Sequence, residues 1–337
     1  MKDLLHYDLT PHNTFGIHAY CRRFIEYSSA EEAVKIASSL NNDHLPLLII
    51  GAGSNLLLRG DFEGTVIHAA VKGREAVEQD NRILLRCGAG ETVDDVIDYA
   101  VDKGWHGAEN LSLIPGEVGA SAVQNIGAYG VEVCEIIHTV EAVDLSTGEQ
   151  VVIPAADCRY AYRDSRFKHE WKNRFLITHV TYRLHRQFLP RLDYGNIRSF
   201  LQEKGCEQPT ARQLREAIIT IRNEKLPDVK VLGNAGSFFV NPVVTRQQFL
   251  DLLAQYPDMP HYEVDPERVK IPAGWLIQQC GWKGRNLGRA GVYERQALIL
   301  VNRGGATGEE IVRLCETIQQ DVWNRFSIAI HPEVNIV

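Results

Sequence analysis

The stretch from residue 110 to residue 130 constrains this chain more than any other part of its sequence. It contains four glycines, two serines and the pair Gln124-Asn125. Glycine adds no side chain to a core and lets backbone N–H groups approach a ligand closely. We therefore predict that this stretch packs no hydrophobic core and instead presents backbone donors to a large polar ligand such as a dinucleotide. A glycine-rich surface loop is the alternative.

A second glycine loop, residues 51–55, directly follows the apolar run 47–50. Its two glycines allow positive φ angles, and Ser54 and Asn55 add side-chain donors. The loop is not a Rossmann fingerprint, because Leu56 stands where the third glycine belongs. Nor is it a P-loop, because no Gly-Lys-Ser/Thr follows. An anion site and a tight turn between strands both remain open.

Apolar spacing and turn residues predict a mixture of helices and short strands. Ser29 with Glu32, and Thr307 with Glu310, form capping boxes that predict helix starts. We expect helices over residues 29–40, 92–104, 213–226 and 307–322, and strands over residues 45–50, 65–68, 83–87, 137–144, 175–184, 297–302 and 328–336. This is an α+β pattern rather than a regular βαβ array, with a domain boundary in the polar stretch 187–208.

Composition excludes several classes of protein. The 337 residues carry a formal net charge of −7, which argues against nucleic acid or an anionic membrane as the main partner. The N-terminal residues lack the apolar core of a signal peptide, so we expect a soluble, cytoplasmic protein. The seven cysteines are widely spaced without a Cys-x-x-Cys pair, and no His-Glu-x-x-His occurs. We expect reduced thiols and no metal site.

The order of several motifs identifies a family resemblance. These motifs are Asn13-Thr14-Phe15-Gly16, the 51–55 loop, Ser112-Leu113-Ile114-Pro115-Gly116, Gln124 to Gly130 (QNIGAYG), Tyr162-Arg163-Asp164-Ser165, Lys225-Leu226-Pro227-Asp228, Gly233 to Phe239 (GNAGSFF), Ala273-Gly274-Trp275-Leu276-Ile277 and Pro332-Glu333-Val334. Together they resemble the bacterial UDP-N-acetylenolpyruvoylglucosamine reductases, over essentially the whole chain. These flavoenzymes complete UDP-N-acetylmuramate synthesis for peptidoglycan.

The resemblance implies a fold that composition does not show. It implies an FAD-binding module of the vanillyl-alcohol oxidase and p-cresol methylhydroxylase type over residues 14–185, in two subdomains split near residue 70. A substrate-binding α+β domain would span residues 209–325, and a C-terminal strand, residues 326–337, would return to the first subdomain. Leu192-Asp193-Tyr194-Gly195 matches the tyrosine-bearing loop of the family's longer form.

The resemblance also implies the cofactors. NADPH would reduce non-covalently bound FAD, which would pass hydride to the enolpyruvyl group of UDP-N-acetylglucosamine enolpyruvate. A covalent link needs a histidine or cysteine, and neither glycine loop has one. The expected FAD-binding residues are Gly51, Ala52, Gly53, Ser54, Asn55, Ser112, Pro115, Gly116, Gly119, Ser121, Gln124, Asn125, Gly127, Tyr129 and Gly130.

Three residues match the family's catalytic positions. Arg163 would grip the substrate carboxylate and stabilise the enolate, because a guanidinium binds a carboxylate through two hydrogen bonds. Ser237 would donate the proton to carbon, and Glu333 would assist as a protonated or hydrogen-bonded carboxyl group. Without the resemblance, each would be taken for an ordinary turn or surface residue. The substrate-contact positions are Tyr162, Tyr194, Lys225, Asn241 and Gln296.

Two other functions fit parts of the pattern. A flavin-dependent oxidase of the same fold, acting on another sugar or alcohol, cannot be separated by fold alone. A non-enzymatic flavin or sugar-nucleotide sensor would have lost a catalytic residue, whereas Arg163, Ser237 and Glu333 are all present. We expect the reductase, as a monomer that binds neither nucleic acid nor membrane.

Overall fold

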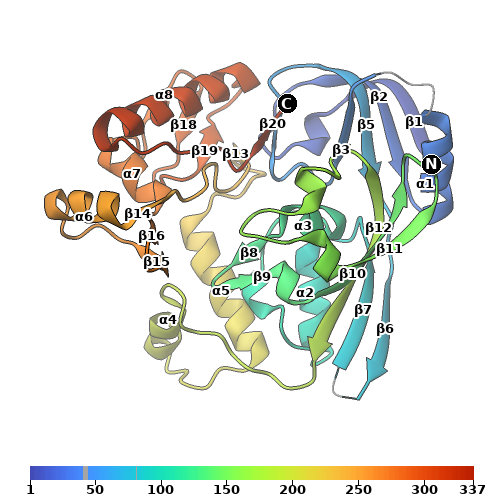
Figure 1. Ribbon diagram of the computed structural model, residues 1–337, viewed down its shortest axis with the longest axis horizontal. Helices are drawn as coiled ribbons and strands as arrows, with labels where there is room; N and C mark the ends of the chain where they lie inside the picture. The colour runs from blue at the N-terminus through green and yellow to red at the C-terminus, as the bar shows by residue number, and fades with distance from the viewer. Residues whose placement is uncertain (41–44, 81) are drawn as a thin grey trace. The chain divides into compact units, whose positions relative to one another are not determined.

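The computed structural model describes residues 1–40, 45–80 and 82–337 (Figure 1). The chain forms two compact units. The first unit contains residues 1–7, 21–52 and 63–224, and the second contains residues 8–20, 53–62 and 225–337. Two short N-terminal segments therefore belong with the C-terminal third of the chain. The predicted domains, with boundaries at residues 185 and 209, are continuous stretches of chain, whereas each observed unit is built from three separate segments.

A four-stranded sheet in the order β1-β2-β5-β3 opens the first unit. Its strands are β1 (Lys2–Asp8), β2 (Tyr20–Tyr27), β5 (Phe62–Ala69) and β3 (Leu47–Ile50). Strands β3 and β5 are parallel. The sequence predicts β3 and β5 but misses β1 and β2. Almost all of β1 is solvent-exposed and carries no apolar alternation.

A five-stranded antiparallel sheet forms the rest of the first unit's β structure, and Figure 1 shows its long strands side by side. Its order is β11 (Gln150–Pro154), β10 (Ile137–Asp144), β12 (Phe175–His185), β7 (Arg82–Gly88) and β6 (Arg74–Gln79). Helix α1 (Ala30–Leu40) packs against β10 and β12, and helix α3 (Val118–Gln124) packs against β12 and β7. The three predicted strands in this sheet, β7, β10 and β12, are confirmed.

The glycine-rich stretch does pack a core, so the prediction that it could not is wrong. Leu111, Val118 and Ala122 are fully buried in the main core of the first unit. Glycine makes this packing closer: a Cβ on Gly119 would lie 2.9 Å from the Cβ of Ala89. Helix α3 forms inside this stretch, and helix α2 (Val93–Asp102) precedes it. The hairpin β8 (Gly127–Ala128) and β9 (Val131–Glu132) follows.

Helix α5 (Ala211–Lys225) confirms the predicted helix near residues 213–226, but it lies in the first unit rather than in a domain starting at residue 209. Its buried residues Leu214 and Ile218 pack with Leu192 and with helix α4 (Ile197–Glu203). The chain therefore passes into the second unit only at Lys225, the last residue of α5.

The described residues of the second unit form a four-stranded sheet, a three-stranded sheet, the pair β4 and β20 described below, and three α-helices. The sheets are β13 (Gly233–Asn234), β19 (Leu300–Asn302), β18 (Ala290–Val292) and β17 (Asn286–Leu287) in one, and β14 (Val243–Thr245), β16 (Arg268–Lys270) and β15 (Tyr262–Asp265) in the other. The helices are α6 (Arg246–Gln255), α7 (Ala273–Gln279) and α8 (Gly308–Phe326). The predicted capping box of Thr307 and Glu310 is confirmed at the start of α8.

The C-terminal strand is much shorter than predicted. Only β20 (Asn335–Ile336) forms a strand, and it pairs in parallel with β4 (Leu56–Leu57). Both strands belong to the second unit. The C-terminus therefore returns to an early segment of the chain, but to one that clusters with the C-terminal residues.

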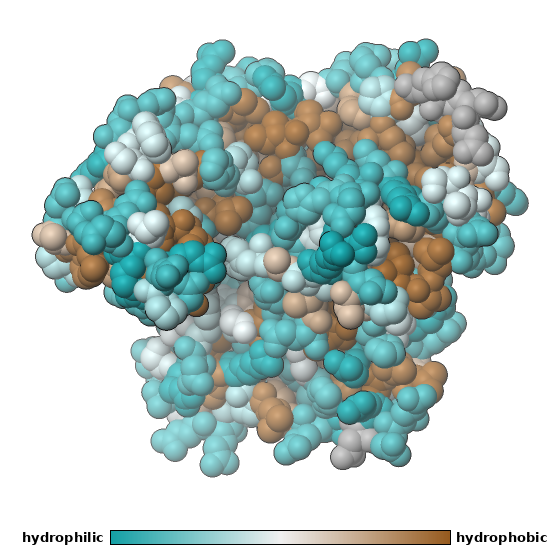
Figure 2. Space-filling view, in the orientation of Figure 1, coloured by the Kyte–Doolittle hydropathy of each residue, from teal (hydrophilic) through white to brown (hydrophobic). Residues whose placement is uncertain are grey.

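The surface hydropathy and the composition of the helices do not point to a particular function. Hydrophilic and hydrophobic residues are interspersed on the face shown in Figure 2. Within the described residues, every helix is too short or too polar to cross a bilayer. Five 3-10 helices complete the described structure: Thr10–His12, Glu109–Leu111, Val133–Glu135, Ala155–Cys158 and Arg166–Lys168.

Candidate active site

Arg163 occupies a tight turn in the first unit. Its φ angle is +56°, and the flanking residues Ala161 and Asp164 exchange two backbone hydrogen bonds of 3.0 and 2.9 Å. Its guanidinium donates to the backbone carbonyl of Asn125, at 3.3 Å, and to that of Gly127. A Cβ on Gly127 would lie 2.8 Å from Nη1 of Arg163. The same Cβ would lie 2.8 Å from the backbone carbonyl oxygen of Val131, so a side chain at position 127 would clash with fixed backbone as well as with the guanidinium.

Three tyrosines lie around this arginine and its loop. Tyr162 is 43% exposed, and the guanidinium carbon of Arg163 lies 5.4 Å from the centre of its ring. Tyr194, 44% exposed, meets the ring of Tyr129 edge-on with 6.3 Å between ring centres. The structure therefore brings the predicted substrate residues Tyr162 and Tyr194 and the predicted cofactor residue Tyr129 into the same unit as Arg163.

Arg222 is a residue that the sequence reasoning missed. It lies on α5, and its Nε atom is buried with no hydrogen-bond partner among the described residues. Burial lowers the pKa of Arg222, and this effect, together with the charge of Arg163, outweighs the opposing contributions of the Tyr129 hydroxyl and the Asp94 carboxylate. A buried donor left unpaired is costly in free energy, so it points to a bound group that would accept its hydrogen bond.

Several predicted cofactor residues are buried and bind their own loop. The side chain of Ser112 donates to the carbonyl of Glu109 at 2.6 Å, and that of Ser121 to the carbonyl of Val118 at 2.7 Å. Asn125 donates to Glu132 and Ala161 and accepts from the N–H of Cys134. These side chains shape the segment, and any ligand would meet backbone atoms or the less buried Pro115, Gly116, Gln124, Gly127, Tyr129 and Gly130.

The 51–55 loop is divided between the two units. Gly51 and Ala52 belong to the first, where a Cβ on Gly51 would lie 2.8 Å from the Cβ of Ala120 on α3. Gly53, Ser54 and Asn55 belong to the second, where Gly53 has a φ of +67° and a Cβ on it would lie 1.9 Å from the carbonyl oxygen of His12. Both positions require glycine, so the loop is more than an ordinary tight turn between strands.

The segments that carry Ser237 and Glu333 are hydrogen-bonded to each other in the second unit. The N–H of Glu333 donates to the carbonyl of Phe238 at 2.8 Å, directly beside Ser237. Ser237 is exposed, whereas Phe238 and Phe239 after it are buried and anchor the segment. Gly236 before it has a φ of +70°, with no atom within 4 Å of the position that a Cβ would take. The serine hydroxyl is therefore accessible on a fixed backbone.

Two predicted substrate residues lie at the start of helix α7 in the same unit. Asn241 accepts a hydrogen bond from the N–H of Ala273 at 2.9 Å. The amide oxygen of Gln296 accepts from the N–H of Leu298 at 3.3 Å, and a Cβ on Gly274 would lie 3.1 Å from it. The N–H of Phe238 donates to the carbonyl of Leu298 at 2.8 Å, so the segment after Gln296 is bonded to the segment after Ser237. Lys225 is exposed.

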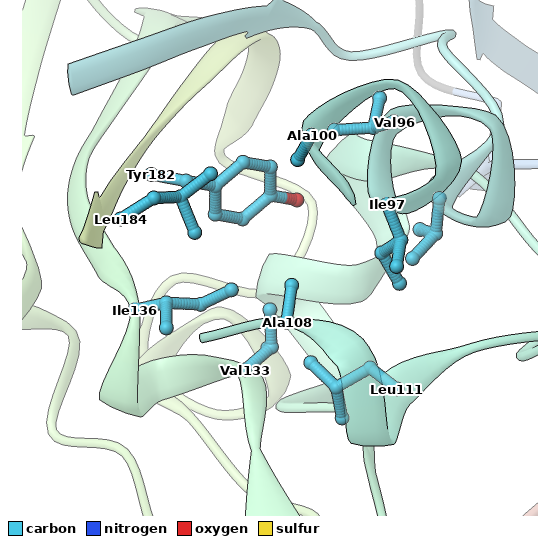
Figure 3. Close-up of a pocket in the computed structure, with 10 residues that line it drawn as sticks. Val96, Ile97, Ala100, Ala108, Leu111, Val133, Ile136, Tyr182 and Leu184 are labelled. Atoms are coloured by element: carbon cyan, nitrogen blue, oxygen red, sulfur yellow. The ribbon is translucent and has the colours of Figure 1, made fainter. Parts of the chain in front are cut away.

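A small internal cavity in the first unit has no part in this site (Figure 3). Its volume is about 10 Å³, enough for a single water at most. Figure 3 shows the ring of Tyr182 among aliphatic side chains from α2, from the segments around residues 108–111 and 133–136, and from β12, which supplies Leu184. The cavity is a packing defect of the core. Among the described residues no group of three His, Cys, Asp or Glu side chains is arranged to hold a metal ion.

Comparison with known proteins decides the family. The chain is 51% identical to the UDP-N-acetylenolpyruvoylglucosamine reductase of Bacteroides fragilis over 98% of its own length and 99% of that protein. It is 46% identical to the reductase of Neisseria gonorrhoeae over 97% and 95% of the two chains. The chain belongs to this family.

Two family models and a solved structure agree with this assignment. Residues 227–337 match the C-terminal domain of UDP-N-acetylenolpyruvoylglucosamine reductase, and residues 22–153 match an FAD binding domain. The crystal structure of the reductase from Thermus caldophilus covers 99% of this chain and 98% of its own, with a TM-score of 0.67 at 20% identity. That likeness confirms the fold: an FAD-binding module followed by a C-terminal domain.

The residues present fit an FAD group. The turn at Gly51 has no room for a side chain, and the stretch around Gly127 and Gly130 leaves backbone atoms accessible. The unpaired Nε of Arg222 provides a buried cationic donor beside Tyr129. Glycine turns and a cation are the features that proteins use to bind a dinucleotide's diphosphate and polar ring edges.

Proposed function

We propose that the chain reduces UDP-N-acetylglucosamine enolpyruvate to UDP-N-acetylmuramate with NADPH, through non-covalently bound FAD. The observation that supports this proposal is the backbone hydrogen bond from Glu333 N–H to the Phe238 carbonyl, which joins the segment of Glu333 to that of Ser237. A serine hydroxyl and a carboxyl group on two joined segments are the kinds of group that can deliver a proton to a carbanion-like carbon. The family membership of the whole chain supports the same reaction.

When bound, FAD supplies the hydride, which it has accepted from NADPH, to the enolpyruvyl methylene carbon. The electron pair of the alkene then moves toward the substrate carboxylate as an enolate. Arg163 is assigned to bind this carboxylate, because a guanidinium stabilises the developing charge without proton transfer. Its backbone partners, the carbonyls of Asn125 and Gly127, fix the guanidinium before substrate arrives.

Ser237 is assigned to protonate the neighbouring carbon as the enolate collapses. The O–H bond of the serine breaks, a C–H bond forms, and the resulting alkoxide must recover a proton. Glu333 is assigned to support that exchange, because a protonated or hydrogen-bonded carboxyl group beside Ser237 can share or return the proton. Ser237 precedes Phe238 in one segment, Glu333 lies in a second segment, and a backbone hydrogen bond from Glu333 to Phe238 joins the two segments.

The remaining assignments concern binding. Lys225 is a natural partner for the diphosphate of the sugar nucleotide, and Asn241 and Gln296 are amide groups with donors suited to the sugar. Tyr162 and Tyr194 present exposed rings in the first unit, and Tyr194 is assigned as a lid residue. We add Arg222, whose buried Nε is assigned to an acceptor on the cofactor or substrate.

A flavin oxidase of the same fold is the alternative. An oxidase has no need of Ser237 as a proton donor to carbon, and the family membership of the whole chain favours the reductase. We also propose that the enzyme works in the cytoplasm, where NADPH and UDP-sugars are made. Cell fractionation tests this location. The expected monomer stays a prediction that sedimentation would check.

A spectrum of the purified protein tests the proposal. We expect a yellow flavin band that NADPH bleaches and that UDP-N-acetylglucosamine enolpyruvate restores without oxygen. Acid denaturation should release the flavin into the supernatant, because no covalent link is expected. Rapid reoxidation by air with no response to the enolpyruvyl substrate would instead indicate the oxidase.

A further inference from the structure

His68, on strand β5 of the first unit, is a buried histidine that none of the catalytic assignments uses. Its residue is 8% exposed. Its Nδ1 lies 3.0 Å from a carboxylate oxygen of Glu26, and its Nε2 lies 3.0 and 3.2 Å from the two carboxylate oxygens of Glu117. Glu26 is also paired with Lys2 at 2.5 Å. The imidazole therefore bridges two acidic residues from different parts of the chain.

The geometry requires a charged imidazole. A neutral histidine has one N–H and one lone pair, so one ring nitrogen would face a carboxylate without a proton between them. Burial lowers the pKa of His68, but the hydrogen bonds and charges of Glu117 and Glu26 outweigh it and raise the pKa above its ordinary value. The other groups facing this cluster are the Lys2 ammonium, beside Glu26, and the Tyr27 hydroxyl, whose pKa Glu117 helps to raise.

Glu117 lies against the first glycine loop. It directly precedes helix α3, and its Oε2 is 3.2 Å from the position that a Cβ on Gly51 would take. Gly51 also approaches Ala120 on the first turn of that helix. The carboxylate is thus held beside the turn whose backbone N–H groups are expected to bind the FAD diphosphate. An uncompensated carboxylate at this point would repel that diphosphate.

We propose that His68 is a positioning residue for cofactor binding: it holds the carboxylate of Glu117 and neutralises its charge, so that the Gly51 turn can accept the diphosphate of FAD. The inference rests on the proposed function, because it assumes that FAD binds at this turn. It assigns a role in cofactor binding to the cluster of His68 and Glu117, which is separate from the proposed catalytic residues. Glu26 and Lys2 then complete the cluster, since Glu26 fixes the other side of the imidazole.

The test compares FAD affinity in full-length variants. His68→Gln keeps a donor but loses the positive charge, and we expect the Kd for FAD to rise roughly tenfold or more, the order expected of one uncompensated charge near an anion at a partly solvated site. The double variant His68→Gln with Glu117→Gln should recover most of this loss, because the repelling charge is gone. His179→Gln is the matched control: His179 contacts Arg86 in another network of the same unit, and its change should leave the Kd unaltered.

The pH dependence gives a second readout that does not require the His68 variant to fold. His68 is protonated below its raised pKa and loses the proton as the pH rises through it. FAD affinity of the wild type should therefore fall with rising pH in that window, while Glu117→Gln should show a flatter profile.

Three results would overturn the inference: an unchanged Kd in His68→Gln, a double variant as weak as the single one, or identical pH profiles for wild type and Glu117→Gln. Each leaves the reductase assignment intact if the wild type binds FAD and turns over. Failure of the wild type to bind FAD at all would instead contradict the proposed function.

Discussion

Arg215 and Arg222 lie about two turns apart on helix α5, and their guanidinium groups have opposite surroundings. Arg215 is 6% exposed and bonds Asp94 through two nitrogens, at 2.6 and 3.1 Å, and Asp98 through Nε, at 2.9 Å. Arg222 retains a buried Nε with no partner in the described structure. The pKa of Arg215 is raised and that of Arg222 lowered, because only Arg215 has carboxylates that outweigh its burial.

The difference separates a structural charge from a functional one. Arg215 fastens α5 to helix α2, so its hydrogen-bonding capacity is used within the fold. Arg222 stays partly unsatisfied at a cost in free energy, which is a common feature of groups reserved for a ligand. Substitutions at the two positions should therefore affect different properties of the enzyme.

Between the two arginines, the larger expected effect is on stability, at Arg215. Arg215→Met should lower the free energy of unfolding by about 3 kcal/mol, because it leaves Asp94 and Asp98 without their buried partner. Both carboxylates are partly exposed, which keeps the loss at the lower end of the usual range. Chemical denaturation measures it, and the activity of the folded protein should be unchanged. Arg212→Met is the control: Arg212 is 37% exposed and pairs with the same helix, so its loss should stay within about 1 kcal/mol.

Arg222→Met should show the reverse pattern. We expect kcat/KM to fall roughly 10²-fold, the usual effect of removing one donor from a preorganised site. The unfolding midpoint should change little or rise, since a poorly compensated buried charge is removed. Steady-state kinetics and thermal unfolding on the same preparation would check both. A variant that is destabilised but fully active would make Arg222 a structural residue like Arg215 and break the comparison.

The smallest effect is expected at Tyr194. Tyr194→Phe removes the hydroxyl but keeps the edge-on packing against Tyr129, so the fold should be unaffected. The KM for the enolpyruvyl substrate should rise by up to about tenfold, the order of one lost hydrogen bond. Reduction by NADPH should be spared, because a lid over the sugar nucleotide acts mainly on substrate capture. Equal losses in both half-reactions would contradict the lid assignment.

Much of the fold could be predicted where side chains show a clear period. The buried face of α8, with Ile311, Leu314 and Ile318, and the capping box before it follow from spacing alone. Strand β1 and helix α3 could not be predicted from the spacing of apolar residues. Strand β1 is exposed along nearly its whole length, and α3 is built from small residues whose burial depends on glycine contacts with Ala89. Glycine permits close packing because it has no side chain, and for the same reason it adds no apolar residue to a recognisable pattern.

The candidate site residues are selected by motif rather than by physical pattern, and their roles stay predictions. Arg163, Ser237 and Glu333 stand on turns and a short extended segment, where spacing carries no signal, and only the family resemblance selects them. Arg222 did leave a signal, because it follows Ile218 by four residues and so continues the buried face of α5. An arginine on an apolar helix face needs either carboxylates, as Arg215 has, or a ligand.

The role of Ser237 is tested most directly by following the two half-reactions of Ser237→Ala separately in an anaerobic stopped-flow experiment. Reduction of the flavin by NADPH needs no proton on substrate carbon, so its rate should stay near that of the wild type. Reoxidation by UDP-N-acetylglucosamine enolpyruvate should slow by roughly 10²–10⁴-fold, the usual contribution of a general acid. Parallel slowing of both steps would show that Ser237 supports the flavin or the loop, and the assignment of the proton donor would be wrong.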